Sequence, residues 1–444
     1  MGFFKTDCEG FHRRDFLKVG SAGVLGLSLP QVLQLEATSK AATNNDNANA
    51  NNNPRRRATS VIMVWLAGGP ATIDMWDLRP DAPENIRGQF RPINTSANGI
   101  QICEHLPNMA RVMDKCTIVR SLAHTIPSHS PATVFMNTGN RPTPALNYPS
   151  MGSLVTRMIP AGQGVPPYVT FNPLRNGAGG GGYLGTAYNP FTVEGGRNAQ
   201  GVRGITLPTG FTLEQLENRN NLLQSFDRNF AALDRNSDLA DGMDAFHRQA
   251  LDILRSDATR NAFDLNRESN EVRDRYGRDS LGQAALSARR LVQAGVRFVT
   301  LSTGGWDTHN QNFQRLSSRN LPPLDRTLAA LIQDLDDQGL LDSTIVYCAG
   351  EFGRTPRINR RGGRDHWARS MSVVLAGGGI RRGYAHGTTD TNGMAPNLNP
   401  CTPDDIAATI CHNLGIDPQH ELMTPTGRPI QLFREGSVIN DMMS

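Results

Sequence analysis

Ser60-Val-Ile-Met-Val-Trp-Leu-Ala67, followed by Gly68-Gly69-Pro70, is the stretch that decides the fold. A continuous apolar run that ends in a glycine turn is typical of a strand buried on both faces of a parallel sheet. Similar runs recur with helical patterns between several of them, which predicts an α/β protein with one three-layer, doubly wound, mostly parallel sheet. The further runs are residues 117–119, 168–171, 296–302, 343–349 and 372–376.

The N-terminal part of the chain has the pattern of an export signal. Arg13-Arg14, followed by Phe16-Leu17-Lys18 and a weakly apolar run to Leu33, predicts a twin-arginine signal peptide over residues 1–42. The run is too short and too weakly apolar for a stable membrane span of about 20 residues. We therefore expect the twin-arginine translocase to export the protein to the periplasm or beyond. A short amphipathic helix with an incidental arginine pair is the alternative.

Export is expected to depend on the arginine pair. Replacing Arg13 and Arg14 by Lys should trap the precursor in the cytoplasm, because the pair precedes the Phe-Leu-Lys and apolar features that complete the signal. Cell fractionation followed by immunoblotting measures this. A normal periplasmic yield of the doubly substituted protein would show that the leader assignment is wrong.

Two further segments complete the domain organisation. Residues 43–58 are Asn-rich and are predicted to form a disordered linker before a folded domain over residues 59–435. Within that domain, residues 177–295 are predicted to be an insertion. Its first part, to Gly204, is rich in Gly, Asn and Arg and is expected to be loop or lid. Residues 211–294 have a helical apolar period and should pack beside the sheet.

Charge and cysteine content narrow the function classes. The formal net charge is +4, but residues 1–58 hold eight Lys/Arg and five Asp/Glu, so the remainder holds 37 and 36, or +1. Such a body is not expected to bind nucleic acid. The six cysteines show no CxxC or Cys/His finger spacing. A bridge between Cys103 and Cys116 stays open if the compartment oxidises thiols.

Three loops that follow predicted strands contain residue types that bind metals. Loops at the carboxyl ends of parallel strands form the sites of α/β proteins, so these loops are expected to converge. Carboxylate oxygen and imidazole nitrogen together suit a borderline divalent cation, with Zn²⁺ or Mn²⁺ favoured. Each loop alone could be an ordinary polar turn, and Glu351 could simply pair with Arg354 or Arg357. The predicted ligands are Asp307, His309, Glu351, Asp365 and His366.

A further candidate lies at the start of a predicted helix. Ser128 or Ser130 is a suitable N-cap, Pro131 suits the first turn, and Gly139 ends the helix. His129 would then lie at a helix N-terminus, where free amides and the helix dipole favour an anion. Capping alone, with His129 as a polar loop residue, is the alternative.

These motifs resemble the alkaline-phosphatase and sulfatase superfamily. Residues 324–353 resemble the sulfatase helix and strand that end in a metal-binding Asp-His-Gly, and residues 129–139 resemble the nucleophile segment. More closely, residues 60–433 resemble the domain of unknown function 1501 family through Gly-Trp-Asp-Thr-His-Asn, Gly-Glu-Phe-Gly-Arg-Thr-Pro and Gly-Arg-Asp-His-Trp. The resemblance implies an alkaline-phosphatase-like fold. By analogy it implies a metal-dependent hydrolase of phosphate, sulfate or related esters, on a small-molecule or glycan substrate.

The chain departs from the superfamily pattern at two positions that matter for chemistry. His129 stands in the place of the usual nucleophile, and Gly68-Gly69 replace the first-strand Asp that binds metal. A non-catalytic metal-containing binding or structural protein of the cell envelope is therefore the alternative to a hydrolase. The remaining candidates are His129, Ser130 and Arg354 for catalysis, Arg141, Arg354 and Trp306 for substrate binding, and His129 and Asp74 as further metal ligands.

Overall fold

The computed structural model describes residues 57–162, 164–174, 178–193 and 256–444. The predicted signal peptide, nearly all of the Asn-rich linker and the predicted helices between residues 211 and 254 lie outside the described residues. Of the described residues, no helix is long and apolar enough to cross a membrane.

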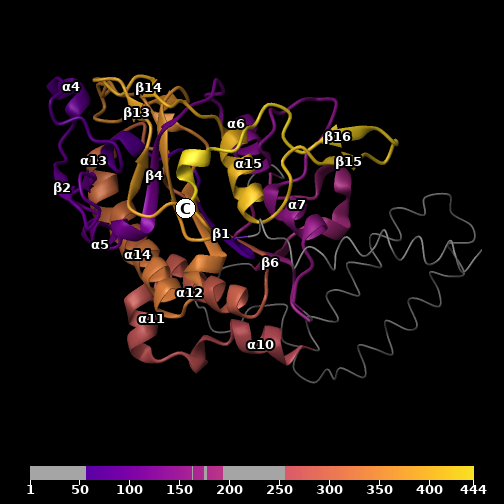
Figure 1. The fold of residues 1–444 in the computed structure, drawn as a ribbon. Coiled ribbons are helices and arrows are strands. Elements are labelled where there is room, and N and C mark those ends of the chain that lie inside the picture. The colour runs from indigo at the N-terminus through magenta and orange to yellow at the C-terminus, as the bar shows by residue number, and fades with distance from the viewer. Residues whose placement is uncertain (1–56, 163, 175–177, 194–255) are drawn as a thin grey trace, which may run out of the picture. The chain divides into compact units, whose positions relative to one another are not determined.

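An eight-stranded sheet forms the centre of the described body, with the strand order β12-β4-β11-β8-β1-β7-β5-β6 (Figure 1). Strand β11 is antiparallel to both of its neighbours, β4 and β8, whereas the other neighbouring pairs are parallel. The prediction of a mostly parallel α/β sheet is thus confirmed. The strands are β1 (Ser60–Leu66), β4 (Cys116–Leu122), β5 (Tyr168–Phe171), β6 (Phe191–Val193), β7 (Phe298–Thr303), β8 (Thr344–Ala349), β11 (Met371–Ala376) and β12 (Tyr384–His386).

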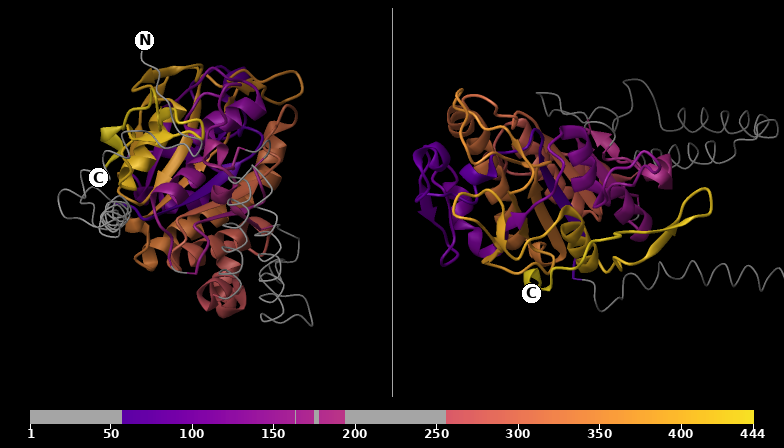
Figure 2. Two further views of the ribbon diagram at one scale, coloured as in Figure 1. Left: turned by 90° about the vertical axis from the view of Figure 1, so that its right-hand side faces the viewer. Right: turned by 90° about the horizontal axis from the view of Figure 1, so that it is seen from above.

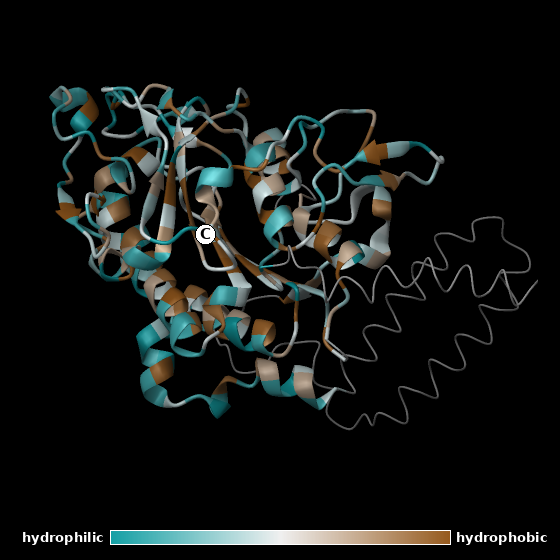
Figure 3. Cartoon of the chain, in the orientation of Figure 1, coloured by the Kyte–Doolittle hydropathy of each residue, from teal (hydrophilic) through white to brown (hydrophobic). Residues whose placement is uncertain are grey.

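Strand β1 lies between β7 and β8 and is buried along its whole length. Successive side chains of a strand point to opposite faces, so a fully apolar strand supplies two cores at once. Ile62, Val64 and Leu66 enter one core, and Val61, Met63 and Trp65 enter the other. Figure 3 shows this apolar centre, with more polar ribbon on the outer helices and loops.

Helices cover both faces of the sheet and make the three layers that the sequence predicts (Figures 1 and 2). On one face α12 contacts β1, β7 and α14, and α14 contacts α5. On the other face α7 contacts β5 and β7, and α15 packs against α6. These helices are α5 (Pro107–Arg111), α6 (His129–Thr138), α7 (Met151–Met158), α12 (Ser280–Gln293), α14 (Leu321–Asp337) and α15 (Pro403–Asn413).

Smaller elements surround this framework. Four two-stranded ribbons are formed by β2 with β3, β9 with β10, β13 with β14, and β15 with β16. The short helices are α4 (Glu84–Arg87), α10 (Asp257–Phe263), α11 (Asn270–Tyr276) and α13 (Asn312–Arg315). The ribbon strands are β2 (Pro92–Asn94), β3 (Gln101–Cys103), β9 (Gly353–Arg354), β10 (His366–Trp367), β13 (Thr388–Thr389), β14 (Pro396–Leu398), β15 (Glu421–Met423) and β16 (Pro429–Gln431).

The structure differs from the sequence-based expectations in two places. Strand β6 lies within the stretch expected to be loop, because Phe191 to Val193 extend the sheet edge beside β5. The described part of the insertion after residue 256 is helical, as expected.

The five cysteines of the described residues are all buried and free, so Cys103 and Cys116 do not form a bridge in this structure.

Candidate metal centre

The predicted ligands converge because several strands present the same end to one side of the sheet. Strands β1, β7 and β8 are parallel, so Gly68, Asp307 and Glu351 follow them at one edge. Strand β11 runs the opposite way, so its beginning lies at that edge and the preceding β10 brings His366 there. The N-terminus of α6 adds His129.

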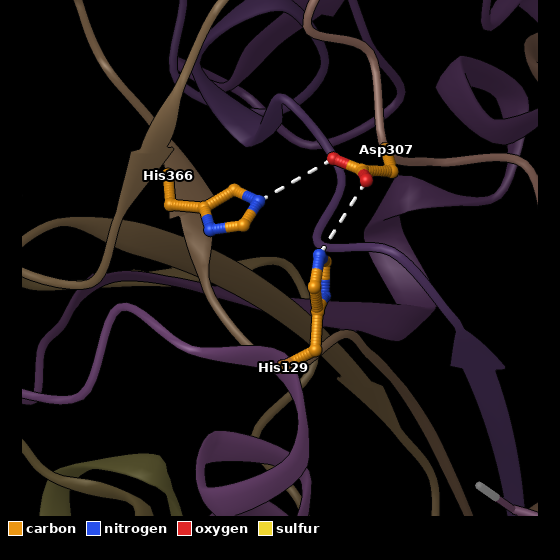
Figure 4. A group of neighbouring side chains, drawn as sticks. All are labelled: His129, Asp307 and His366. Atoms are coloured by element: carbon orange, nitrogen blue, oxygen red, sulfur yellow. Dashed lines mark hydrogen bonds and ion pairs between the residues drawn. The ribbon is translucent and has the colours of Figure 1, made fainter.

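Asp307 lies at the middle of the cluster, with an imidazole on either side of its carboxylate (Figure 4). Its Oδ2 is 3.5 Å from His129 Nε2, and its Oδ1 is 3.4 Å from His366 Nε2. Ligand atoms of these three residues all lie within 4.8 Å of one another. His309 completes the cluster, with Nε2 at 3.1 Å from Asp307 Oδ1 and 3.0 Å from His366 Nε2.

Each of the three imidazoles is held through its other ring nitrogen. His129 Nδ1 donates to Glu351 Oε1 at 2.6 Å, and His309 Nδ1 donates to Asp365 Oδ1 at 2.6 Å. His366 Nδ1 donates to the Pro127 carbonyl at 3.0 Å. Because a carbonyl or carboxylate oxygen accepts each of these bonds, a ring that carries a single proton has it on Nδ1 and directs the Nε2 lone pair into the cluster.

This donor set fits a divalent cation. Three lone pairs and a carboxylate face one another, and the Nε2 atoms of His309 and His366 have no proton to share between them in this tautomer. A cation would relieve that repulsion. In a tetrahedral site with bonds of about 2.0–2.1 Å, ligand atoms lie about 3.3–3.4 Å apart. The separations of 3.0, 3.1, 3.4 and 3.5 Å lie close to that value. Those to Asp307 involve both of its oxygens, and the residues whose ligand atoms all lie close to one another are His129, Asp307 and His366.

The charges around the cluster favour its metal-binding protonation states. Burial works to raise the pKa of Asp307, but the hydrogen bond and charge of Arg354 outweigh it and hold the pKa below its usual range. Burial, with smaller effects of the Arg354 and His129 charges, lowers the pKa of His366 despite its bond to Pro127. An ionised carboxylate and a neutral imidazole are the forms that bind a metal.

Glu351 lies behind the cluster and orients it. Its side chain is only 3% exposed, and Oε1 accepts both from His129 Nδ1 and from the Gly68 amide, the latter at 2.9 Å. Its Oε2 is buried and has no hydrogen-bond partner among the described residues. Carboxylates that receive the second nitrogen of a ligating imidazole fix the ring and raise its basicity. We therefore place Glu351 as the group that orients His129, where the sequence led us to expect a ligand.

A cavity of about 790 Å³ opens beside the cluster, within the range of small-molecule sites. His129, Ser130, Asp307 and Glu351 line it. Ser130 is exposed, and it follows His129 in the first turn of α6. The opposite side of the cavity comes from the loops after β5 and β7, through Asn172, Pro173, Ser302, Gly304 and Gly305.

His124 connects two parts of the site, and no motif of the sequence singled it out. It is buried, its Nε2 donates to the Glu351 carbonyl at 2.8 Å, and its Nδ1 accepts from the Ile126 amide. Burial lowers its pKa to about 4, so the ring is neutral at physiological pH. It ties the backbone of Glu351 to the loop whose Pro127 carbonyl holds His366.

Arg354 does not have the position of a substrate-binding residue. Its guanidinium is fully buried and donates to the carbonyls of Gly68, Gly69 and Arg364 as well as to Asp307 Oδ1. These contacts leave it no free edge toward the cavity. The structure does not bring Arg354, which the sequence predicts for catalysis and substrate binding, into the lining of the cavity; instead Arg354 fixes the turn after β1 and lowers the pKa of Asp307.

Asp74 is likewise engaged elsewhere. Arg364 donates to both of its oxygens, Nε to Oδ2 at 2.7 Å and Nη2 to Oδ1 at 2.6 Å, and Asn312 donates to Oδ2 at 2.8 Å. Both members of the pair are buried. The structure therefore does not bring Asp74, which the sequence predicts as a metal ligand, to the cluster. The pair instead fixes Arg364, which directly precedes Asp365 and His366.

Breaking this pair should strongly destabilise the fold. Asp74→Ala would leave the Arg364 guanidinium buried without its carboxylate, which costs about 3–5 kcal/mol. Chemical denaturation of the metal-free protein measures the loss in the free energy of unfolding. Arg79→Ala, which removes a partner of the less buried Asp77, is the control and should cost less. Equal stability of Asp74→Ala and wild type would contradict this account.

Trp306 and Arg141 also lie outside the cluster. Trp306 is 2% exposed and belongs to one of the two main cores, and the structure does not bring it into the lining of the cavity beside His129. Arg141 lies after α6, donates to Thr125 Oγ1 at 3.1 Å and covers the Phe135 ring. It lines a different cavity from that beside His129.

Two glycines allow the loops to approach closely. A Cβ on Gly68, which has φ +120°, would lie 2.5 Å from the Asp307 amide nitrogen. A Cβ on Gly363 would overlap the backbone of His309. The glycine turn after the first strand was visible in the sequence, but the segment that it contacts was not.

The described body is thus a three-layer α/β protein with a His/Asp cluster suited to a metal at the strand ends. The chain belongs to the family described as "Protein of unknown function (DUF1501)", whose model matches residues 58–443. This confirms the family predicted from the three motifs. Among curated proteins, none matches this sequence significantly.

Several solved structures are similar to the chain at low sequence identity. A protein in the alkaline phosphatase superfamily from Vibrio parahaemolyticus is 11% identical, with 81% of this chain and 67% of that chain covered and a TM-score of 0.37. A sulfatase from Pseudoalteromonas sp. is 13% identical, with 85% and 71% covered and a TM-score of 0.35. A phosphonate monoester hydrolase from Silicibacter pomeroyi is 10% identical, with 80% and 73% covered and a TM-score of 0.36.

Proposed function

We propose that this protein is an exported, metal-dependent hydrolase of phosphate, sulfate or related esters. The observation that carries the proposal is the convergence of three Nδ1-anchored imidazoles on the Asp307 carboxylate at the mouth of a cavity. We propose His129, His309 and His366, each through Nε2, and Asp307 as the residues that would hold the ion. Zn²⁺ or Mn²⁺ suits this nitrogen and oxygen donor set.

A bound divalent ion would polarise the ester oxygen and lower the pKa of a coordinated water from about 16 toward 7. The chain's own residues supply the rest. Arg354 keeps Asp307 ionised, and Asp365 and the Pro127 carbonyl hold His309 and His366 in one tautomer. Glu351 and the Gly68 amide fix the place of His129, beside the cavity that would hold the ester.

The proposed substrates are esters of a small molecule or a glycan, and the proposed location is the periplasm or the exterior. The arginine pair and the apolar leader support export, and the near-neutral body supports the absence of a nucleic-acid partner. A twin-arginine route suits a chain whose site forms only when folded, because that route carries folded proteins.

Metal analysis combined with an ester screen tests the function. The purified protein should contain a stoichiometric divalent metal and should hydrolyse at least one of p-nitrophenyl phosphate, bis(p-nitrophenyl) phosphate and p-nitrophenyl sulfate. EDTA should remove both the metal and the activity. A metal-loaded protein that is inactive on all three would refute the hydrolase and identify a non-catalytic metal protein of the same fold. A protein without metal affinity would refute the centre itself.

A further inference from the structure

A second cavity, of about 610 Å³, lies at the far end of α6 from His129. Its lining comes from the residues after α6, the first turn of α15 and the ribbon of β15 and β16. Three arginines line it, and we call it the arginine cavity after Arg141, Arg428 and Arg434. Its size is within the range of ligand sites, about 300–1,000 Å³.

The backbone holds each arginine in place. Arg428 closes the turn between β15 and β16, where its amide donates to Thr424 Oγ1 and its carbonyl accepts from the Thr424 amide. Arg434 directly follows Phe433, which is 1% exposed. Arg141 donates to Thr125 and lies over the Phe135 ring, 4.9 Å from its centroid. These contacts order the main chain at Arg428 and Arg434 and the side chain of Arg141, and all three arginines are exposed to an incoming ligand.

The positive charge of this cavity is not fully used within the described residues. No described carboxylate lies within ion-pair distance of the Arg428 or Arg434 guanidinium. Of the two acidic residues in the lining, Asp404 lies in the first turn of α15, where the helix dipole compensates its charge. Glu435 is exposed. Arg428 and Arg434 are exposed as well, so three arginines and two carboxylates leave the lining with one net positive charge for an outside anion. A guanidinium matches sulfate or phosphate oxygens bidentately.

Part of the remaining lining is apolar and suits the face of a sugar ring, and Asn140, Thr143, Thr424 and Thr426 add polar groups to it. Leu146, Tyr148 and Ile430 are partly exposed there, with Pro142 and Pro425 beside them. An anion alone would need no such surface. We propose that the arginine cavity binds the sulfate or phosphate group of an acidic sugar unit that belongs to an oligosaccharide ligand.

The arginine cavity lies close enough to the metal centre for one ligand to reach both. The inference that one ligand does so rests on the proposed function. Helix α6 spans nine steps from His129 to Thr138, or about 14 Å. Arg141 also contacts Thr125, in the same loop that supplies His124 and Pro127 to the centre. A ligand that reaches both sites must therefore be longer than one sugar, and its second acidic group would select an oligosaccharide.

Calorimetric binding of a sulfated chondroitin hexasaccharide, its unsulfated counterpart and inorganic sulfate tests the proposal. The sulfated hexasaccharide should bind, and Arg428→Gln/Arg434→Gln should weaken it by about tenfold or more, because two charged hydrogen-bond donors are lost. The matched control Arg87→Gln/Arg91→Gln removes the same charge from exposed sites and should change the affinity by less than about twofold. The unsulfated hexasaccharide and inorganic sulfate should each bind far more weakly.

Equal losses in the two double variants would overturn the cavity as the binding site. Equal affinity for the unsulfated hexasaccharide would overturn the role of the anion, and equal affinity for inorganic sulfate would overturn the role of the sugar. The loss caused by Arg428→Gln/Arg434→Gln should be of the same size in a His309→Ala background, because His309 does not line the cavity. Retained binding in a protein without hydrolytic activity would refute the proposed function alone, and lost binding in an active enzyme would refute this cavity alone.

Discussion

Asp307→Ala should abolish stoichiometric metal binding, with a loss of affinity greater than about 100-fold. Replacing a residue that only orients a metal ligand lowers the metal affinity by about 10–100-fold. Replacing a carboxylate that faces three imidazoles should lower it by more. Glu351→Gln and Asp365→Asn should fall within that smaller range, because they contact His129 and His309 through Nδ1. Competitive titration with Zn²⁺ and Mn²⁺ measures the affinities.

The thermal unfolding of the same variants gives an independent measurement. A metal that binds only the native state stabilises it by RT ln(1 + [L]/Kd), so the wild type should gain stability with added metal and Asp307→Ala should not. Asp114→Ala removes a carboxylate that bonds Ser96 away from the centre and should behave as wild type. If Asp307→Ala kept the wild-type metal content and metal-dependent stability, the proposed ligand set would be wrong.

His129→Ala should remove most of the turnover on whichever ester the screen identifies, by a factor of about 10²–10⁴ if His129 acts on a proton in the reaction. Ser130→Ala should cost only a few-fold, as expected for a helix-start residue or a substrate hydrogen bond. His420→Ala, at an exposed position, is the control. Steady-state kinetics measure the three variants.

The metal content of His129→Ala separates two roles for this residue. As a ligand, its loss should release metal, whereas as a general base its loss should leave the metal in place and remove a limb from the pH profile. We favour the ligand role, because His129 Nδ1 is already held by Glu351 while its Nε2 lies 3.5 Å from Asp307 Oδ2. The reverse ranking of Ser130 and His129, or a phosphoryl group captured on Ser130, would show that Ser130 is the nucleophile.

The strands of the sheet could be predicted from the sequence, because a strand that is buried on both faces is a continuous run of apolar residues. Strand β1 has no polar residue beyond Ser60, and each apolar run near residues 117, 168, 296, 343 and 372 became a strand of the sheet. The antiparallel direction of β11 could not be predicted, because a short buried run has the same composition in either direction. Strand β6 was missed because only Phe191 to Val193 pair there, in a segment of otherwise loop-like composition.

The sequence was also sufficient to bring most of the candidate ligands together, because residues that follow parallel strands share an edge. It failed where a contact joins distant segments. Asp74 has the spacing of a ligand, and only the structure shows Arg364, 290 residues away, on both of its oxygens. Arg354 and Trp306 look like surface residues in a polar motif, yet both are buried. Whether an arginine faces solvent or a carbonyl is a property of packing.

The reversed strand β11 also decides when the centre can assemble. His129 and His366 come from widely separated parts of the chain, and His366 reaches the edge only after β11 has inserted between β4 and β8. Contacts across such sequence separations carry a large loop-closure cost and form late in folding. A nascent chain shorter than 366 residues has an incomplete ligand set, so the ion cannot act as a folding nucleus. The metal that the centre binds would then depend on which metal ions are available in the compartment where β11 joins the sheet. This step would precede any passage of the folded protein through a translocase.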